Sequence, residues 1–330
     1  MVLETGLVQR FGEFVICHDD RVAANSGESS DVSEKAAASA VPGSGGWPDL
    51  PAPLPVSVPD SHCHLNITYQ RSQGRQDNGD PSDSGFSVTE ALAHARSVGV
   101  TRVLQVGYDL ESSRWGVDVA RSHDEVIAAV ALHPNEAPKL AASGALDEAF
   151  DEITKLVGDP RVRAVGETGL DYFRTGPEGR GAQEESFRRH IALAKSAGRA
   201  LVIHDRDAHD DVVRVLVSEG APERVVFHCF SGGAELARVC AEHGWFMSFA
   251  GPVTFKANDH LRAALLEVPA ELLLVETDAP FLTPVPFRGR PNASYLIPVT
   301  MRAMAEVRNV DVAELATTVS AATERAFGVW

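Results

Sequence analysis

From residue 86 onward, short aliphatic and β-branched runs alternate with longer segments in which apolar residues recur every three or four positions. The short runs predict buried strands, and the longer segments predict amphipathic helices that turn one face to a core. The predicted strands cover residues 56–64, 102–106, 126–130, 162–166, 200–203, 224–227, 245–249 and 272–275. The predicted helices cover residues 88–98, 112–121, 146–157, 183–197, 207–217, 234–243, 259–266, 295–307 and 312–327.

The strict alternation of strands and helices predicts an α/β fold with a parallel sheet. Eight such units in about 270 residues fit a (β/α)8 TIM barrel. An open, doubly wound sheet is the alternative. No glycine-rich phosphate loop or dinucleotide fingerprint follows any predicted strand, which weakens that alternative.

The first part of the chain differs from the rest. Residues 25–54 are rich in Ser, Ala, Gly and Pro and offer little apolar surface to bury. We therefore expect residues 1–54 to form a disordered N-terminal extension and residues 55–330 to form the barrel domain. Residues 71–85 are polar and predict a second flexible segment, after the first strand.

Composition and charge restrict the partners. The chain has 330 residues, a formal net charge of −16 and four Cys, without the spacing of a disulfide framework. No run of about 18 apolar residues predicts a membrane span, and no signal peptide is apparent, so we expect a cytoplasmic protein without a membrane partner. The acidic balance argues against broad electrostatic capture of nucleic acid, although a local phosphate site is still compatible with it.

Polar residues cluster where the predicted strands end. In a strand, His62 and His64 point to one side and Cys63 to the other, an arrangement that suits one metal ion held by two imidazoles. Further candidates at strand ends are His133, Glu167, His204, His228 and Asp278. The seven other histidines fall on predicted helices or the N-terminal segment, where a solvated surface position is the default: His18, His94, His123, His190, His209, His243 and His260.

Each candidate also has a simpler explanation. In these explanations Glu167 caps the next helix or pairs with an Arg, His204 is an ordinary barrel-rim histidine, and Asp278 forms an Asx turn. Taken together, these explanations fail because so many polar groups at one barrel mouth would lack partners. Nitrogen and carboxylate ligands in this number suit two divalent ions.

Five ordered motifs resemble those of the TatD family of metal-dependent deoxyribonucleases, which are amidohydrolase-like barrels. They are DSHCHL at 60–65, GETGLDY at 166–172, IHDR at 203–206, HCFSG at 228–232 and ETDAPFL at 276–282. Further blocks at 183–187, 249–256 and 288–292 are also similar, and the resemblance runs from about residue 58 to 327. Asn66 departs from the family pattern, where Asp is usual, and so does Asn135–Glu136 after His133, where a further His is common.

The resemblance implies a role for each ligand candidate. His62, His64 and Asp278 would hold one metal ion, His204 and His228 would hold a second, and Glu167 would bridge both. The ions would be Mg²⁺, Mn²⁺ or Zn²⁺; ligand softness favours Zn²⁺ or Mn²⁺, whereas the family suggests Mg²⁺. Metal activation of a water, with Asp278 accepting its proton, would then cleave a phosphodiester bond.

The resemblance implies a DNA substrate and exonucleolytic trimming that starts more readily at the 3′ end. The acidic net charge and the single barrel mouth favour single-stranded or frayed ends over the middle of a duplex. His133, Arg206, Lys256 and Arg288 are weaker candidates for phosphate contacts, as is Arg290. No stable protein partner is inferred. Hydrolysis of a small amide, an ester or an aminoacyl-tRNA ester is the alternative, and a binding scaffold without activity is a third class.

Overall fold

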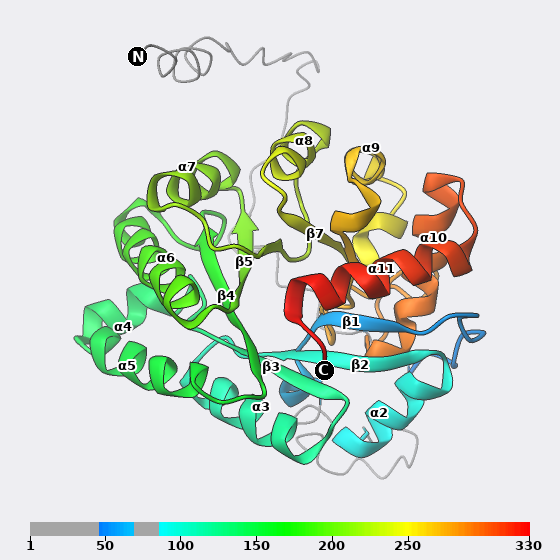
Figure 1. The fold of residues 1–330 in the computed structure, drawn as a ribbon, viewed down its shortest axis with the longest axis horizontal. Coiled ribbons are helices and arrows are strands. Elements are labelled where there is room, and N and C mark those ends of the chain that lie inside the picture. The colour runs from blue at the N-terminus through cyan, green and yellow to red at the C-terminus, as the bar shows by residue number, and fades with distance from the viewer. Residues whose placement is uncertain (1–45, 69–85) are drawn as a thin grey trace, which may run out of the picture. The chain divides into compact units, whose positions relative to one another are not determined.

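The computed structural model describes residues 46–68 and 86–330 (Figure 1). The disorder expected for residues 1–45 and the whole flexible segment expected at 71–85 lie outside the described residues. Among the described residues, no helix is both long and apolar enough to cross a membrane.

Eight parallel strands form one sheet in the order β1 to β8, and each strand pairs with the next along the chain. The sheet curls into a barrel because β1 also meets the segment after β8: His64 N–H donates to Ala279 O at 2.8 Å, and Asp278 N–H donates to His62 O at 2.9 Å. This confirms the predicted TIM barrel. The strands are β1 Val58–Cys63, β2 Val100–Val106, β3 Val126–Val130, β4 Val162–Asp171, β5 Ala200–Arg206, β6 Val225–Phe227, β7 Phe246–Phe249 and β8 Leu273–Val275.

Helices connect the strands and surround the barrel (Figure 1). Nine of them match predicted segments to within a few residues, with α6 beginning six residues earlier than expected. Helix α4, which begins at Ala137 with Pro138 in its first turn, was not predicted, because seven residues are too few to reveal a helical period. The helices are α2 Val88–Ser97, α3 Leu110–Ser122, α4 Ala137–Ser143, α5 Leu146–Val157, α6 Pro177–Ala197, α7 His209–Glu219, α8 Ala234–Glu242, α9 Asp259–Glu267, α10 Ile297–Arg308 and α11 Val312–Phe327.

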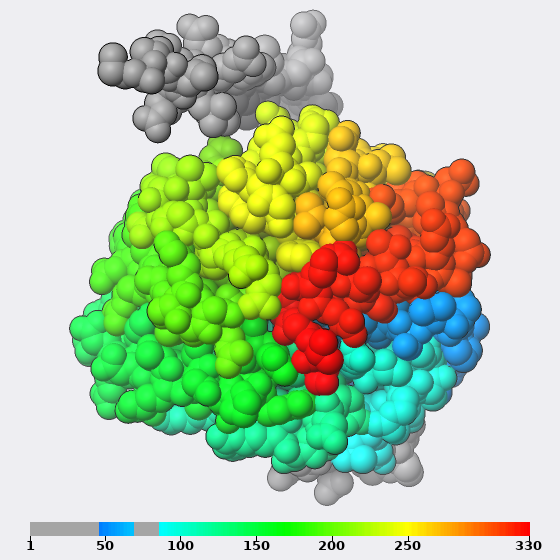
Figure 2. Space-filling model, viewed as in Figure 1, coloured from blue at the N-terminus to red at the C-terminus, as the bar shows by residue number. Residues whose placement is uncertain are grey.

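Strand alternation creates two cores. Side chains such as Val103 and Val165 face outward and pack against the helices, whereas Leu104 and Val202 fill the barrel interior. Phe327 of α11 joins the interior core, and the C-terminal segment, red in Figure 2, covers the centre of the face drawn there. Because α11 also donates from Ser320 to Ser57 O, just before β1, it lies at the N-terminal ends of the strands.

Residues 46–54 differ from the expected disordered extension. Leu54 is buried, Arg302 donates to the carbonyls of Ala52 and Pro53 at 2.8 and 3.0 Å, and Tyr295 OH donates to Pro48 O at 2.8 Å. Composition alone missed this contact, because a proline-rich segment can supply backbone carbonyls to arginines elsewhere in the chain. Residues 46–54 therefore pack on the barrel, although they precede the expected boundary at residue 55.

Candidate metal centre

Five strands, β1, β4, β5, β6 and β8, bring the predicted ligands together around one carboxylate, that of Glu167 in the C-terminal half of β4. His228 Nε2 lies 2.8 Å from Glu167 Oε2, and His204 Nδ1 lies 3.4 Å from the same oxygen. His62 Nε2 approaches it to 3.9 Å, and His64 Nε2 lies 3.8 Å from Oε1. One carboxylate thus faces four imidazole rings.

Asp278 completes a group on the β1 and β8 side. Its Oδ1 lies 3.5 Å from His64 Nε2 and 3.8 Å from His62 Nε2, and the two histidine nitrogens are 3.3 Å apart. The potential ligand atoms of these three residues all lie within 4.8 Å of one another. Asp278 has φ of +53°, a left-handed conformation that is unfavourable for a non-glycine residue and is typical of functional sites.

The opposite side of Glu167 carries the second group. His204 comes from β5, and His228 directly follows β6; their facing nitrogens, Nδ1 and Nε2, are 3.5 Å apart. The close approach of β4 to β5 depends on Gly169, where an added Cβ would lie 2.1 Å from His204 O. The structure therefore brings together all six of the ligand candidates that the strand ends predicted.

Hydrogen bonds show which nitrogen each histidine presents to the centre. His64 Nδ1 lies 2.9 Å from Val106 O, and a carbonyl can only accept, so this nitrogen donates and Nε2 keeps a free lone pair. His204 Nε2 similarly lies 3.2 Å from Asp171 Oδ2, and His228 Nδ1 lies 3.2 Å from Glu276 Oε1. Their inner nitrogens are thus left facing Glu167.

This arrangement fits divalent metal ions. Three inner nitrogens and the Glu167 carboxylate direct lone pairs at a common space, and buried Glu167 Oε2 has no aligned hydrogen-bond donor among the described residues. Convergent acceptors repel one another unless protons or cations lie between them. Imidazoles held at the outer nitrogen by a carboxylate or carbonyl are the usual arrangement around bound metal ions.

The charges of the centre are strongly coupled. Burial lowers the pKa of His62 well below its ordinary value, and the neighbouring His228 lowers it further. Burial would also lower the pKa of His228, but the charges of Glu167 and Glu276 outweigh burial and raise it. Glu167 shows the opposite balance: burial would raise its pKa, but His133 and His228 hold it well below the ordinary value, so the carboxylate is ionised.

His133 differs from the other histidines of the centre. The backbone N–H of Asn135 donates to His133 Nδ1 at 3.0 Å, so the neutral ring carries its hydrogen on Nε2. Burial lowers the pKa of His133 to about 3, which keeps the ring neutral near pH 7. The potential ligand atoms of His133, Glu167 and His204 also lie close together. His133 Nε2, however, carries a hydrogen, so it faces Glu167 Oε1 at 3.6 Å as a hydrogen-bond donor and does not offer a lone pair.

The predicted phosphate-binding cations lie outside this cluster: Arg206 is the last residue of β5, and Lys256 and Arg288 lie in the segments after β7 and β8. Arg206 covers the ring of Phe173 at 3.9 Å, and Arg288 covers that of Phe255 at 4.3 Å. Arg290 does not fit the expectation of a phosphate contact, because its guanidinium donates to the carbonyls of Gly46 and Trp47.

Two buried acids and one buried histidine were not assigned roles from the sequence. Asp171 contacts the outer nitrogen of His204, and Glu276 contacts that of His228. The sequence feature that could have revealed both is an acid at a strand end, next to a motif that supplies a metal ligand. His190 was expected at the surface, but it is fully buried, accepts the N–H of Leu132 at 3.2 Å and contacts Ser186 O at 2.7 Å. Helical position alone did not show which face of α6 turns inward.

The barrel and its strand-end ligands define a metal-dependent hydrolase. Residues 59–328 match the family described as TatD related DNase. The chain belongs to the TatD family.

Two relatives align with most of this chain. One is an uncharacterized metal-dependent hydrolase, TatD, of Mycobacterium tuberculosis, 44% identical over 82% of this chain and 97% of the relative. Another is the uncharacterized metal-dependent hydrolase YabD of Bacillus subtilis, 35% identical over 82% of this chain and 98% of the relative. The crystal structure of the TatD homologue YjjV of Escherichia coli has the same fold, with a TM-score of 0.68 and 23% identity over 83% of this chain and 98% of that chain.

Proposed function

We propose that this hydrolase cleaves phosphodiester bonds of DNA and trims single-stranded or frayed ends, using two divalent ions. The observation that carries the proposal is the position of Glu167 between two groups of ligand atoms. His62, His64 and Asp278 would hold one ion, His204 and His228 the other, and Glu167 would contact both. Ions held there would lower the pKa of a bound water toward about 7 and offset the charge of a phosphate.

Asp278 is placed to accept the proton of the attacking water. Its Oδ1 faces His62 and His64, whereas no hydrogen bond or ion pair to Oδ2 is found among the described residues. Oδ2 is thus free to take a proton while Oδ1 stays directed at the centre. His133 contributes from the opposite side, because its neutral Nε2–H is a donor that suits a non-bridging phosphate oxygen.

Three cations near the mouth support a phosphate-containing substrate. Within residues 46–68 and 86–330, no carboxylate lies within ion-pair distance of Arg206, Lys256 or Arg288, whereas surface arginines such as Arg188 and Arg214 are paired with acids. The side chains of Arg206 and Arg288 are stacked on Phe173 and Phe255, and Phe173 is 51% exposed. Aromatic rings beside cations are typical of surfaces that bind single strands.

The net charge of −16 favours a short contact with the substrate. Duplex binding requires neutralisation of many phosphates and weakens steeply with salt, whereas a few cations at one barrel mouth grip only a few phosphates. We therefore expect a shallow salt dependence and a preference for chain ends, which are more flexible than the middle of a duplex.

A time course on linear and circular single-stranded DNA of equal length tests the proposal. The metal-reconstituted protein should shorten the linear strand to mononucleotides and leave the circle intact. The His204→Ala variant, purified in the same way, should be inactive on both and so controls for contaminating nucleases. Efficient cutting of the circle would refute end trimming, and inertness toward both DNAs with turnover of small esters would refute the choice of substrate.

A further inference from the structure

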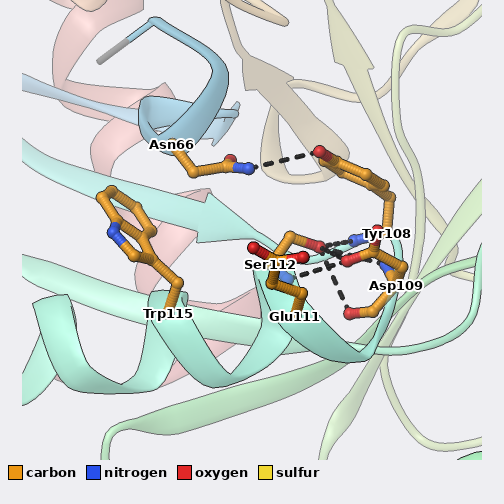
Figure 3. Close-up of a pocket in the computed structure, with 6 residues that line it drawn as sticks. All are labelled: Asn66, Tyr108, Asp109, Glu111, Ser112 and Trp115. Carbon is orange, nitrogen blue, oxygen red and sulfur yellow. Dashed lines mark hydrogen bonds between the residues drawn. The ribbon is translucent and has the colours of Figure 1, made fainter. Parts of the chain in front are cut away.

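A small pocket of about 130 Å³ lies beside the metal centre, at the ends of β1 and β2 (Figure 3). Tyr108 links the pocket to the metal centre, because it lines the pocket and its ring contacts that of His64 edge to face, with 5.7 Å between the ring centroids. Its volume is below the roughly 300–1,000 Å³ of pockets that enclose a drug-sized ligand, so it suits one planar group. The lining residues are Asn66, Tyr108, Asp109, Glu111, Ser112 and Trp115.

The orientation of buried Asn66 in this pocket is fixed. Leu65 N–H donates to Gln105 Oε1 at 2.7 Å, so Gln105 Nε2 is the donor that meets Asn66 Oδ1 at 3.2 Å. Asn66 Nδ2 then donates to Tyr108 OH at 3.4 Å. Because an amide nitrogen carries two hydrogens, one Asn66 hydrogen has no acceptor among residues 46–68 and 86–330, and within these residues the Tyr108 hydroxyl hydrogen also has none.

The acidic groups of the pocket supply acceptors. Asp109 Oδ1 accepts from the backbone N–H of Ser112 at 2.7 Å and from its hydroxyl at 2.6 Å. No hydrogen bond to Asp109 Oδ2 or to the Glu111 carboxylate is found in the part of the chain that the structure describes. Two carboxylates repel a phosphate, so the pocket suits a group that is uncharged or cationic and that donates hydrogen bonds.

Aromatic rings supply the apolar surface. Figure 3 shows the rings of Trp115 and Tyr108 on opposite sides of Asn66. Both rings are half-buried, so part of each is open to a ligand. A flat heteroaromatic ring gains about 1–3 kcal/mol from stacking on such side chains when it binds from a single strand.

We infer that this pocket binds a nucleobase that carries an exocyclic amino group, from the nucleotide at the end of the substrate strand. Adenine, cytosine and guanine present an amino donor together with a ring nitrogen or carbonyl acceptor, which match the carboxylates and the Asn66 and Tyr108 donors. Thymine presents one N–H between two carbonyls and matches less well. The inference rests on the proposed function, and the pocket would give the enzyme a preference among strand ends.

Direct binding of nucleosides tests the pocket without catalysis. Deoxycytidine, deoxyadenosine and thymidine are titrated into the full-length protein while tryptophan fluorescence is followed. The first two should bind about tenfold more tightly than thymidine, since hydrogen bonds to a charged acceptor contribute that much. Trp115→Phe, which keeps a ring, should remove the fluorescence change and retain most of the affinity measured by equilibrium dialysis.

A matched pair of variants isolates the acidic acceptor. Glu111 and Glu148 are both exposed acids in the first turn of a helix, α3 and α5 respectively. Glu111→Gln should reduce the tenfold preference for amino-bearing nucleosides to about twofold or less, and Glu148→Gln should leave it unchanged. Equal affinity for all three nucleosides in the wild type, or an unchanged preference in Glu111→Gln, would overturn the inference.

Trimming of oligonucleotides that differ only in the terminal base separates the two proposals. Hydrolysis of DNA at rates that ignore the terminal base would overturn the pocket assignment and leave the proposed function intact. Absence of DNA hydrolysis, with the nucleoside preference present, would overturn the proposed function and leave the pocket as a site for another nucleoside compound.

Discussion

The two sides of the metal centre are built differently. On the β5 and β6 side, the outer nitrogens of His204 and His228 face the carboxylates of Asp171 and Glu276. On the β1 side, His64 is held by the carbonyl of Val106, and buried His62 Nδ1 has no hydrogen-bond partner in the part of the chain that the structure describes. The outer nitrogens of the imidazoles therefore face carboxylates on one side of the centre but not on the other.

This difference affects how tightly each side should hold a cation. A carboxylate behind an imidazole makes the inner nitrogen more basic and offsets the charge of a bound ion. Burial would lower the pKa of His204, but the neighbouring carboxylates of Asp171 and Glu167 outweigh burial and raise it, whereas the pKa of His62 is lowered. We expect the β5 and β6 side to depend on its buried acids and the β1 side to depend on the carboxylate of Asp278.

The largest effect should come from the residue that both sides share. Glu167→Ala should reduce the binding of both ions and lower hydrolysis by about a thousandfold or more, because several kcal/mol of charge stabilisation disappear. Metal analysis by mass spectrometry, with circular dichroism as the control for folding, tests this. Retention of both ions in a folded variant would show that Glu167 is not shared.

A smaller effect should separate the two sides. Glu276→Gln keeps an oxygen that can accept from Cys229 N–H, at 2.8 Å, and from His228, but it removes the charge. The affinity of the second ion should fall about 10- to 100-fold, and that of the first should stay within about threefold. Metal titrations followed by calorimetry measure both in one protein, so the first ion is the internal control. An equal loss at both sites would contradict the comparison.

The smallest effect concerns His190, a buried histidine outside the centre that lacks a carboxylate. Burial lowers its pKa from 6.5 to about 4 in the folded protein, so the unfolded chain takes up this proton first as the pH falls. Its contribution to stability is complete above pH 6.5 and declines as the pH falls toward 4. We expect this group to lower the free energy of unfolding by about 1–2 kcal/mol between pH 7.5 and 5.5.

The His190→Gln variant supplies the test of that pH dependence. Its free energy of unfolding, from urea titrations, should decline less steeply between pH 7.5 and 5.5 than that of the wild type. His243→Gln is a suitable control, because His243 is exposed at the C-terminal end of α8. Parallel curves for the wild type and His190→Gln would show that His190 does not carry this dependence.

The fold and the ligand cluster were predictable because both depend on local periodicity. Strands such as β3 and helices such as α5 follow from apolar spacing, and a parallel barrel places all strand ends at one mouth. His62, Glu167 and Asp278 therefore meet, although more than 200 residues separate the first from the last.

The remaining features depend on contacts between distant segments. The donor role of His133 follows from a hydrogen bond with Asn135, which no spacing rule reveals. The pocket joins Asn66 to Trp115 through the pairing of β1 with β2, and the docking of residues 46–54 depends on Arg302. Such features need the three-dimensional arrangement because the sequence shows only that the residues are polar or aromatic.

The most direct test of the central claim is the metal content of three proteins dialysed against the same limiting metal buffer. The wild type should retain about two ions per chain, and His62→Ala and His204→Ala should each retain about one, with all three folded by circular dichroism. A single ion in the wild type, or an unchanged content in both folded variants, would contradict a centre of two sites that meet at Glu167.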